Sequence, residues 1–184
     1  MVGILGVMSS MTACTNVAVS GAQAIYNHKS LQDNINDTVM ALRATHVLNH
    51  PQFDDAKISI ATLNSEVLLT GEAPQPWQKE RATELVNKVK GVKGVYNYIT
   101  YSSPASALSQ ASDAWLTTKV KGKIIASYNI DATRIKVVTE KGKVYLMGTL
   151  TPEEAEEVMT IANTTDGVRS VVKLFSYIKL TKTL

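Results

Sequence analysis

Val67-Leu-Leu-Thr-Gly71-Glu72 and, 77 positions later, Val144-Tyr-Leu-Met-Gly148-Thr149 are two versions of one short stretch. Each is a run of mostly apolar residues that ends in a glycine, and each is followed by a segment whose apolar residues have helical spacing. Self-similarity at a fixed period indicates a repeated structural unit. The sequence therefore predicts two small domains of one kind, and function should depend on how the two copies differ.

The similarity continues to the end of each unit. Gly91-Val-Lys-Gly-Val95 in the first copy matches Gly167-Val-Arg-Ser-Val171 in the second. A strand-like run then closes each unit, over residues 96–101 and 172–178. Each unit has about 65–70 residues, close to the lower size at which an apolar core stabilises a domain alone. Packing of the two units against each other would add to that core.

The first unit has the pattern helix, strand, strand, helix, strand. A helix is expected from Asp37, and Pro51 prevents its continuation. Strands are expected over 57–62 and 67–70, because the first run alternates apolar and polar residues and a short turn joins it to the second. A second helix should follow Pro76.

The second unit repeats this plan. Residues 134–139 and 143–149 form a hairpin around Lys141-Gly142, and Thr151 with Glu154 forms a capping box at the start of the next helix. Two helices on one face of a three-stranded sheet would bury the apolar stripes. The fold class is therefore predicted as α+β, with two tandem α-β-β-α-β domains.

The chain divides into five parts: a signal-like segment (1–14), a tether (15–32) with some helix expected over 17–25, a first domain (33–101), a Ser- and Ala-rich linker (102–112) and a second domain (113–180). The overall balance of 19 basic and 16 acidic residues is too mild to indicate a nucleic-acid partner. Residues 33–104 carry 7 Lys/Arg and 8 Asp/Glu, whereas residues 113–184 carry 11 and 8. An anionic partner should therefore prefer the second domain.

Cys14 is the only cysteine, so no internal disulfide is expected. It follows an almost wholly apolar run, Ser9-Ser10 and Met11-Thr-Ala, which is typical of a secretory signal and too short to span a bilayer. The pattern resembles the bacterial lipobox, although Met11 replaces the usual Leu and no Lys or Arg precedes the apolar run. We expect Cys14 to be lipidated, because two acyl chains anchor a protein stably. The alternative is an incidental free cysteine near a chain end.

The α-β-β-α-β order, the glycine at a strand end and the Gly-Val-x-x-Val before the last strand resemble the BON domain. The resemblance covers both units, about three quarters of the chain. It extends to the dual-BON outer-membrane lipoproteins of Gram-negative bacteria through Val95-Tyr-Asn97, Trp115-Leu-Thr-Thr-Lys-Val120 and Val144-Tyr-Leu-Met-Gly148. That resemblance implies a protein on the periplasmic face of the outer membrane. It also implies binding of anionic phospholipid by the first helix of the second domain, and support of cell-envelope integrity at the division site.

The residues of that helix define two faces. At about 100° per residue, Leu116, Val120 and Ile124 form a narrow stripe that should face the sheet. The predicted lipid-binding residues share a different face: Trp115, Lys119, Gly122, Lys123 and Ala126. Trp favours the headgroup level of a bilayer, and Lys reaches phosphates while its stem lies on apolar surface. The expected partner is a phosphatidylglycerol-like membrane. The alternative is that Trp115 packs against the first domain or the linker.

No other motif indicates chemistry. His46 and His50 have i, i+4 spacing, but Pro51 follows and no further ligand is evident, so a metal site is not expected. No arrangement suited to a nucleophile is present, so we expect no catalytic residue and no cofactor. Trp77, beside Gln78 and Lys79, is interpreted as a packing residue.

An alternative function is a periplasmic protein-interaction or osmotic-stress chaperone module. Such a module would hold peptide segments at exposed sheet edges or between the domains. Outer-membrane proteins are further expected partners.

Overall fold

The computed structural model describes residues 21–178, with side chains described from Ile35 onward. Cys14, the predicted lipidation site, lies outside the described residues. The first domain contains α1 (Gly21–Leu48), a short 3-10 turn (Pro51–Phe53), β1 (Lys57–Leu63), β2 (Glu66–Ala73), α2 (Pro76–Asn87), β3 (Gly94–Asn97) and β4 (Thr100–Tyr101). The second contains α3 (Ala107–Ile125), a 3-10 turn (Ala132–Arg134), β5 (Ile135–Glu140), β6 (Lys143–Leu150), α4 (Pro152–Asn163) and β7 (Ser170–Tyr177).

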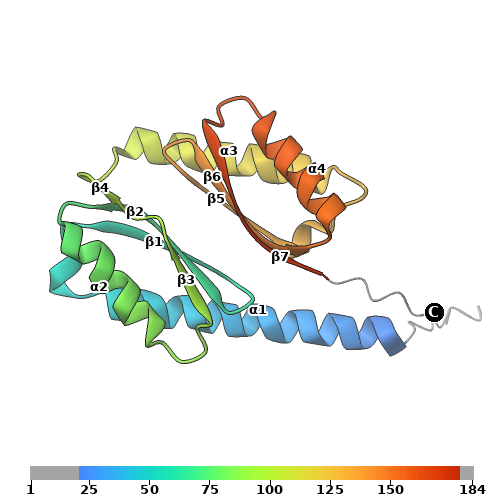
Figure 1. Ribbon diagram of the computed structural model, residues 1–184, viewed down its shortest axis with the longest axis horizontal. Coiled ribbons are helices and arrows are strands. Elements are labelled where there is room, and N and C mark those ends of the chain that lie inside the picture. Colours follow the sequence, from blue (N-terminus) through green and yellow to red (C-terminus); the bar gives the residue numbers. More distant parts are fainter. Residues whose placement is uncertain (1–20, 179–184) are drawn as a thin grey trace, which may run out of the picture.

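Each domain is a small mixed sheet with two helices on one face (Figure 1). In both, the first two strands form an antiparallel hairpin, and the last strand lies parallel to the second. The strand orders are β1-β2-β3, with β4 also beside β2, and β5-β6-β7. The α+β fold with two tandem α-β-β-α-β units is thus confirmed.

The glycine that opens the repeat has a steric role in the first domain. Gly71 has φ +108°, and a Cβ atom added there would lie 2.0 Å from the carbonyl oxygen of Lys57 on β1. Only glycine adopts this backbone conformation at low cost and permits such an approach. The counterpart Gly148 is less constrained, because its added Cβ would lie 3.2 Å from the Arg134 oxygen.

An aspartate on the first helix of each domain holds the hairpin turn. Asp37 on α1 accepts hydrogen bonds from the backbone N–H groups of Asn64 and Ser65, at 2.7 and 2.9 Å. Asp113 on α3 accepts from those of Lys141 and Gly142, at 2.7 and 2.8 Å. All four turn residues have positive φ, so the carboxylates bind turns of unusual backbone conformation. Both aspartates are buried. Because they make equivalent hydrogen bonds in the two domains, they belong to the repeated unit.

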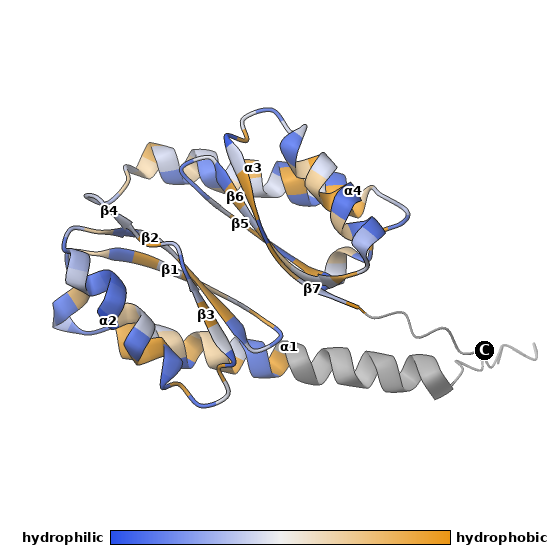
Figure 2. Ribbon diagram, viewed as in Figure 1, coloured by the Kyte–Doolittle hydropathy of each residue, from blue (hydrophilic) through white to orange (hydrophobic). Residues whose placement is uncertain are grey.

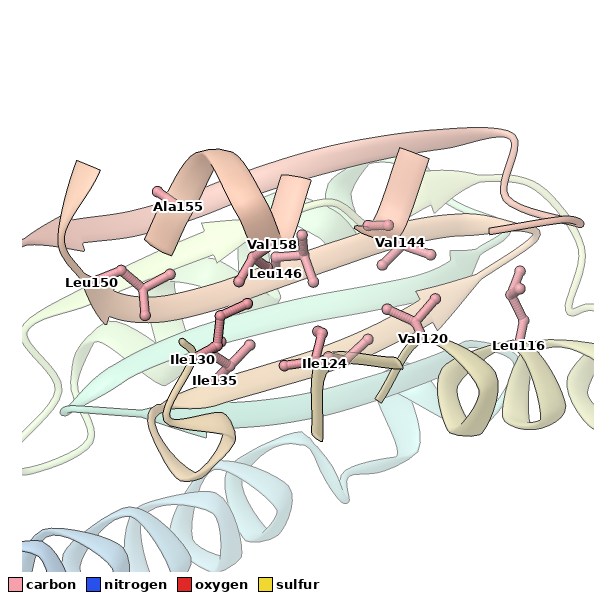
Figure 3. Close-up of a cluster of buried hydrophobic side chains, with 12 residues drawn as sticks. Leu116, Val120, Ile124, Ile130, Ile135, Val144, Leu146, Leu150, Ala155 and Val158 are labelled. Carbon is pink, nitrogen blue, oxygen red and sulfur yellow. The ribbon is translucent and has the colours of Figure 1, made fainter. Parts of the chain in front are cut away.

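Each domain has its own apolar core between its helices and its sheet. Figure 3 shows the core of the second domain, where α3, β5, β6 and α4 contribute side chains. The predicted stripe of Leu116, Val120 and Ile124 is buried there, as expected. In α4 the predicted capping box is present, since Thr151 and Glu154 exchange hydrogen bonds between side chain and backbone.

Three boundaries of helices and strands differ from those expected. The first helix begins at Gly21 rather than Asp37, so the helical part of the expected tether is longer than the sequence indicated and continues into the first domain. The expected linker 102–112 ends early, because Ser106 caps α3 by accepting a hydrogen bond from Ser109 N and the helix begins at Ala107. The last strand of the first domain is interrupted between Asn97 and Thr100.

The two sheets pack face to face, with the helices on the outside of the molecule (Figure 1). A third apolar cluster fills the space between them: Ala61, Leu68, Tyr145, Met147 and Leu174, with Leu63, Tyr96, Tyr98, Val138 and Val172 at its margin. The rings of Tyr98 and Tyr145 come from different domains and lie 5.0 Å apart. Figure 2 shows apolar residues along the strands, which lie between the helices of the first domain and those of the second.

Candidate functional site

The outward face of α3 carries the residues predicted to bind lipid. Trp115 is 64% exposed, so most of its side chain is open to solvent rather than packed against the first domain or the linker. Gly122, Lys123 and Ala126 are also exposed, and Lys119 is half-buried. The opposite side of the helix is fixed in the core by its buried stripe. The helix is therefore held in an orientation that leaves this face open to solvent.

Lys119 and Trp115 are linked in space. The Lys119 Nζ lies 5.1 Å from the centre of the Trp115 ring, a cation–π distance. The same ammonium donates to the backbone oxygen of Asp166 at 3.2 Å and lies 3.5 Å from its carboxylate. Lys119 is therefore partly neutralised and helps to position the indole. Lys123 has no ion pair among the described residues, so it is the freer cation of this face.

The structure adds apolar residues that the sequence analysis missed. Leu108 is 82% exposed and, at about 100° per residue, lies on the same line of α3 as Trp115. The sequence analysis places Leu108 in the linker. Recognising Ser106 as a helix cap would have placed Leu108 on the helix. Ile125 and Tyr128 are also largely exposed, at the other end of the helix. We name Leu108, Trp115, Lys119, Gly122, Lys123 and Ala126 the α3 face.

Trp77, interpreted as a packing residue, is 49% exposed at the start of α2, so about half of its surface is open to solvent. Among the described residues, no Lys ammonium lies over the Trp77 ring as Lys119 lies over the Trp115 ring. Across the described part of the chain, no group of three or more His, Cys, Asp or Glu residues could hold a metal ion. No described helix combines the length and apolar character needed to cross a membrane.

A charged cluster lies where the two domains meet. Glu72 on β2 is buried, pairs with Lys141 Nζ at 2.8 Å, and accepts a hydrogen bond from Ala105 N at 3.3 Å. Glu140, at the end of β5, lines the same groove as Glu72 and Asp113. Burial, together with the negative charges of these two residues, raises the pKa of Glu140 to about 7. The cluster joins the first domain, the linker and the second domain.

Comparison with known protein families identifies the repeated unit. The family model described as "BON domain" matches residues 41–103 and 112–179. The chain belongs to the BON-domain family. The two matched regions correspond to the two α+β units, and each contains a hairpin, a covering helix and a last parallel strand. The predicted dual-BON organisation is confirmed.

Several known proteins are similar to this chain over most of its length. "Outer membrane lipoprotein DolP" of Haemophilus influenzae is 30% identical over 181 residues, covering 95% of this chain and 94% of that protein. The "21 kDa hemolysin" of Actinobacillus pleuropneumoniae is 31% identical, covering 82% and 79%. "Osmotically-inducible protein Y" of Escherichia coli is 28% identical, covering 68% and 64%. The chain is thus a dual-BON protein similar to DolP.

Proposed function

We propose that this protein is a lipid-anchored outer-membrane protein that faces the periplasm and binds anionic phospholipids through the α3 face. The observation that carries the proposal is Trp115, an exposed indole with Lys119 beside its ring, on a helix whose other side is buried. Lys123 follows Lys119 by one turn. The similarity to an outer-membrane lipoprotein supports the membrane assignment. The protein then acts by binding, without catalysis.

The proposed mechanism has two steps. Lipidated Cys14 tethers the chain to the inner leaflet of the outer membrane, and the α3 face then docks on the same surface. Trp115 and Leu108 enter the headgroup region, and Lys123 approaches phosphate groups. Each Lys near an anionic surface contributes about 1 kcal/mol, so docking alone is weak. The tether makes weak docking sufficient, because it raises the local concentration of the α3 face.

The proposed role is support of outer-membrane integrity at the division site. A tethered protein with a second, weaker membrane contact responds to the local lipid composition, because only the second contact depends on headgroup charge. Phosphatidylglycerol-like lipids are the expected ligands, and outer-membrane proteins are further expected partners. The net positive charge of the second domain favours this side of the molecule for an anionic surface.

Flotation on vesicles tests the proposal. The full chain carrying Cys14→Ser is mixed with phosphatidylcholine vesicles that contain or lack phosphatidylglycerol. We expect flotation only with the anionic vesicles. Trp115→Ala should remove most of the bound fraction, and Lys123→Ala should weaken binding about fivefold, the equivalent of about 1 kcal/mol.

Two matched controls come from the chain itself. Trp77→Ala removes the other exposed tryptophan, and Lys121→Ala removes an exposed lysine from a different side of α3; both should float like the unsubstituted chain. If the controls and the α3-face variants behave alike, the site is wrong. If the Cys14→Ser chain floats with neither vesicle, the lipid-binding proposal fails and a protein-binding module becomes the better account.

A further inference from the structure

β7 is the longest edge strand of the described residues. It pairs with β6 over all eight of its residues and with no other described strand. Ile178 N, just beyond it, donates to Leu150 O at 2.9 Å. Because parallel strands alternate their hydrogen bonds, the backbone groups of Val171, Lys173 and Phe175 point away from β6. An edge of this kind is a template for another strand.

The equivalent edge of the first domain is closed. Asn97 on β3 donates from Nδ2 to Lys79 O at 2.7 Å and to Thr83 Oγ1 at 2.6 Å, which fastens the strand to α2. Its Oδ1 accepts from Ile99 N at 2.9 Å, and the strand is interrupted there. Short and interrupted edges of this kind protect sheets against unwanted pairing.

The second domain lacks this closure. By register, Asn97 lies opposite Leu69 and Lys173 lies opposite the matching Leu146, so Lys173 takes the place of Asn97. Thr160 donates to Glu156 O at 2.9 Å, just as Thr83 donates to Lys79 O at 3.2 Å. The helix therefore keeps the hydrogen-bonding pair that Asn97 binds in the first domain, but Lys173 does not use it.

A groove of about 550 Å³ lies between α4 and β7 instead. Its apolar lining comes from Ala155, Met159 and Phe175, and Glu156 and Lys173 are the charged residues on it. Lys173 is exposed and has no salt bridge among the described residues. Successive residues of β7 face opposite sides of the sheet. Lys173 and Phe175 face the groove, whereas Leu174 belongs to the cluster between the domains.

We propose that β7 and the groove beside α4 bind an extended segment of a partner protein, which joins the second sheet as a further strand. Main-chain hydrogen bonds to β7 supply affinity, and side chains on alternate residues supply specificity. One groove-facing side chain of the partner should be apolar and pack on Met159 and Phe175. A carboxylate two residues away, on the same face, would pair with Lys173. This surface is separate from the α3 face and does not depend on lipid binding.

Selection from a phage-displayed library of random decapeptides tests the proposal, with the full chain carrying Cys14→Ser as bait. We expect enriched peptides to combine an apolar residue with Asp or Glu two positions away. A synthetic copy of the strongest peptide should slow hydrogen exchange at the amides of Val171, Lys173 and Phe175. It should leave the amides of the α3 face unchanged.

Two substitutions at one position separate the backbone edge from the groove. Lys173→Pro removes an outward N–H and blocks strand addition, and it should weaken peptide binding at least about tenfold. Lys173→Asn should close the groove against Thr160 as Asn97 does against Thr83, and should also weaken binding. Lys121→Ala is the control and should bind normally. If circular dichroism shows that Lys173→Pro does not fold, peptide binding by Lys173→Asn tests the proposal alone.

Three results would overturn the proposal. One is a selection that enriches no peptide above a surface without protein. Another is a set of enriched peptides that bind both Lys173 variants as tightly as the unsubstituted chain. A third contrary result is dimerisation of the unsubstituted chain in sedimentation, abolished by Lys173→Pro. That result would make a second copy, through its own β7, the occupant of the edge.

Discussion

Asp37 and Asp113 show how single side chains fix the geometry of each domain. Each is buried on the first helix and binds two N–H groups of a turn whose backbone has positive φ. The bond therefore joins a helix to a hairpin that is distant in sequence. The sequence analysis placed Asp37 at the start of a helix but predicted a turn-binding role for neither aspartate, because an aspartate on a helix is ordinarily a solvated side chain.

Replacing Asp113 by Ala should lower the free energy of unfolding by about 2–3 kcal/mol, because two turn N–H groups lose a charged acceptor. Chemical denaturation with urea measures the change, and Asp37→Ala should have a similar effect in the first domain. Asp166→Ala is the control, since that side chain is 96% exposed and should cost under about 0.5 kcal/mol. Equal costs for Asp113→Ala and Asp166→Ala would contradict the assigned role.

Glu140 makes stability depend on pH near neutrality. Its pKa is raised from 4.5 to about 7 by burial and by Glu72 and Asp113, while Lys141 and Lys57 oppose the shift. The folded state therefore binds a proton that the unfolded chain releases, and stability falls as pH rises from about 4.5 to about 7. Burial is the main cause of the raised pKa of Tyr145, and the negative charge of Glu140 raises it further.

Urea unfolding at pH 5 and pH 8 checks this dependence. The unsubstituted chain should lose stability between the two pH values, and Glu140→Gln should lose less. Glu84→Gln is a useful control, because salt bridges to Lys88 and Arg81 lower the pKa of Glu84 to about 2, outside this window. An unchanged pH dependence in Glu140→Gln would assign the proton to another group.

Helix α3 combines a side buried in the core with an exposed side, and Asp166 limits the positive charge of the exposed side. Asp166→Asn removes the carboxylate 3.5 Å from Lys119, so the α3 face gains free positive charge. We expect stronger binding to phosphatidylglycerol vesicles, by up to about fivefold. Lys119→Ala should weaken binding less than Lys123→Ala, because Lys119 is already engaged. Flotation at matched lipid concentrations ranks the variants, and the reverse order would show that Lys119 is the main lipid contact.

The regular parts of the elements followed from the sequence, and their ends did not. Leu116, Val120 and Ile124 were predicted to be buried because their spacing matches the helical period. The start of α1 was missed because residues 21–36 have no clear apolar period, and helix formation there continues from a segment anchored by packing. The first turn of α3 was missed because a Ser- and Ala-rich stretch fits both a linker and a helix start.

Packing of the two domains was expected from their small size, but the use of the sheet faces for that contact was not, although the signal was present. The runs Val67–Leu69 and Val144–Met147 are apolar at successive positions, which is typical of strands buried on both faces. Alternate residues of these runs, Leu68, Tyr145 and Met147, fill the cluster between the domains. The partner surface itself could not be predicted, because apolar contacts are not specific in sequence.

For the whole molecule, the ion pair between Lys141 and Glu72 should stabilise the arrangement of the domains. Lys141→Ala would leave Glu72 buried without its cation. We expect the free energy of unfolding to fall by about 2–3 kcal/mol, less than for a fully buried pair because Lys141 is 41% exposed. In calorimetry we expect one unfolding transition for the unsubstituted chain and two for Lys141→Ala. Adding Glu72→Gln to Lys141→Ala should recover part of the loss. No recovery would show that the ion pair is not the source of the effect.

The sequence order of the two sheets has a consequence for biosynthesis. Each domain is a continuous segment of the chain, so the first sheet is complete once Tyr101 has been synthesised. Tyr145 and Met147, which cover its apolar face, do not yet exist at that moment. The nascent protein therefore passes through a stage with Leu68 and its neighbours uncovered, when it is most exposed to aggregation. The delay between the emergence of the two halves of the chain then becomes a determinant of yield.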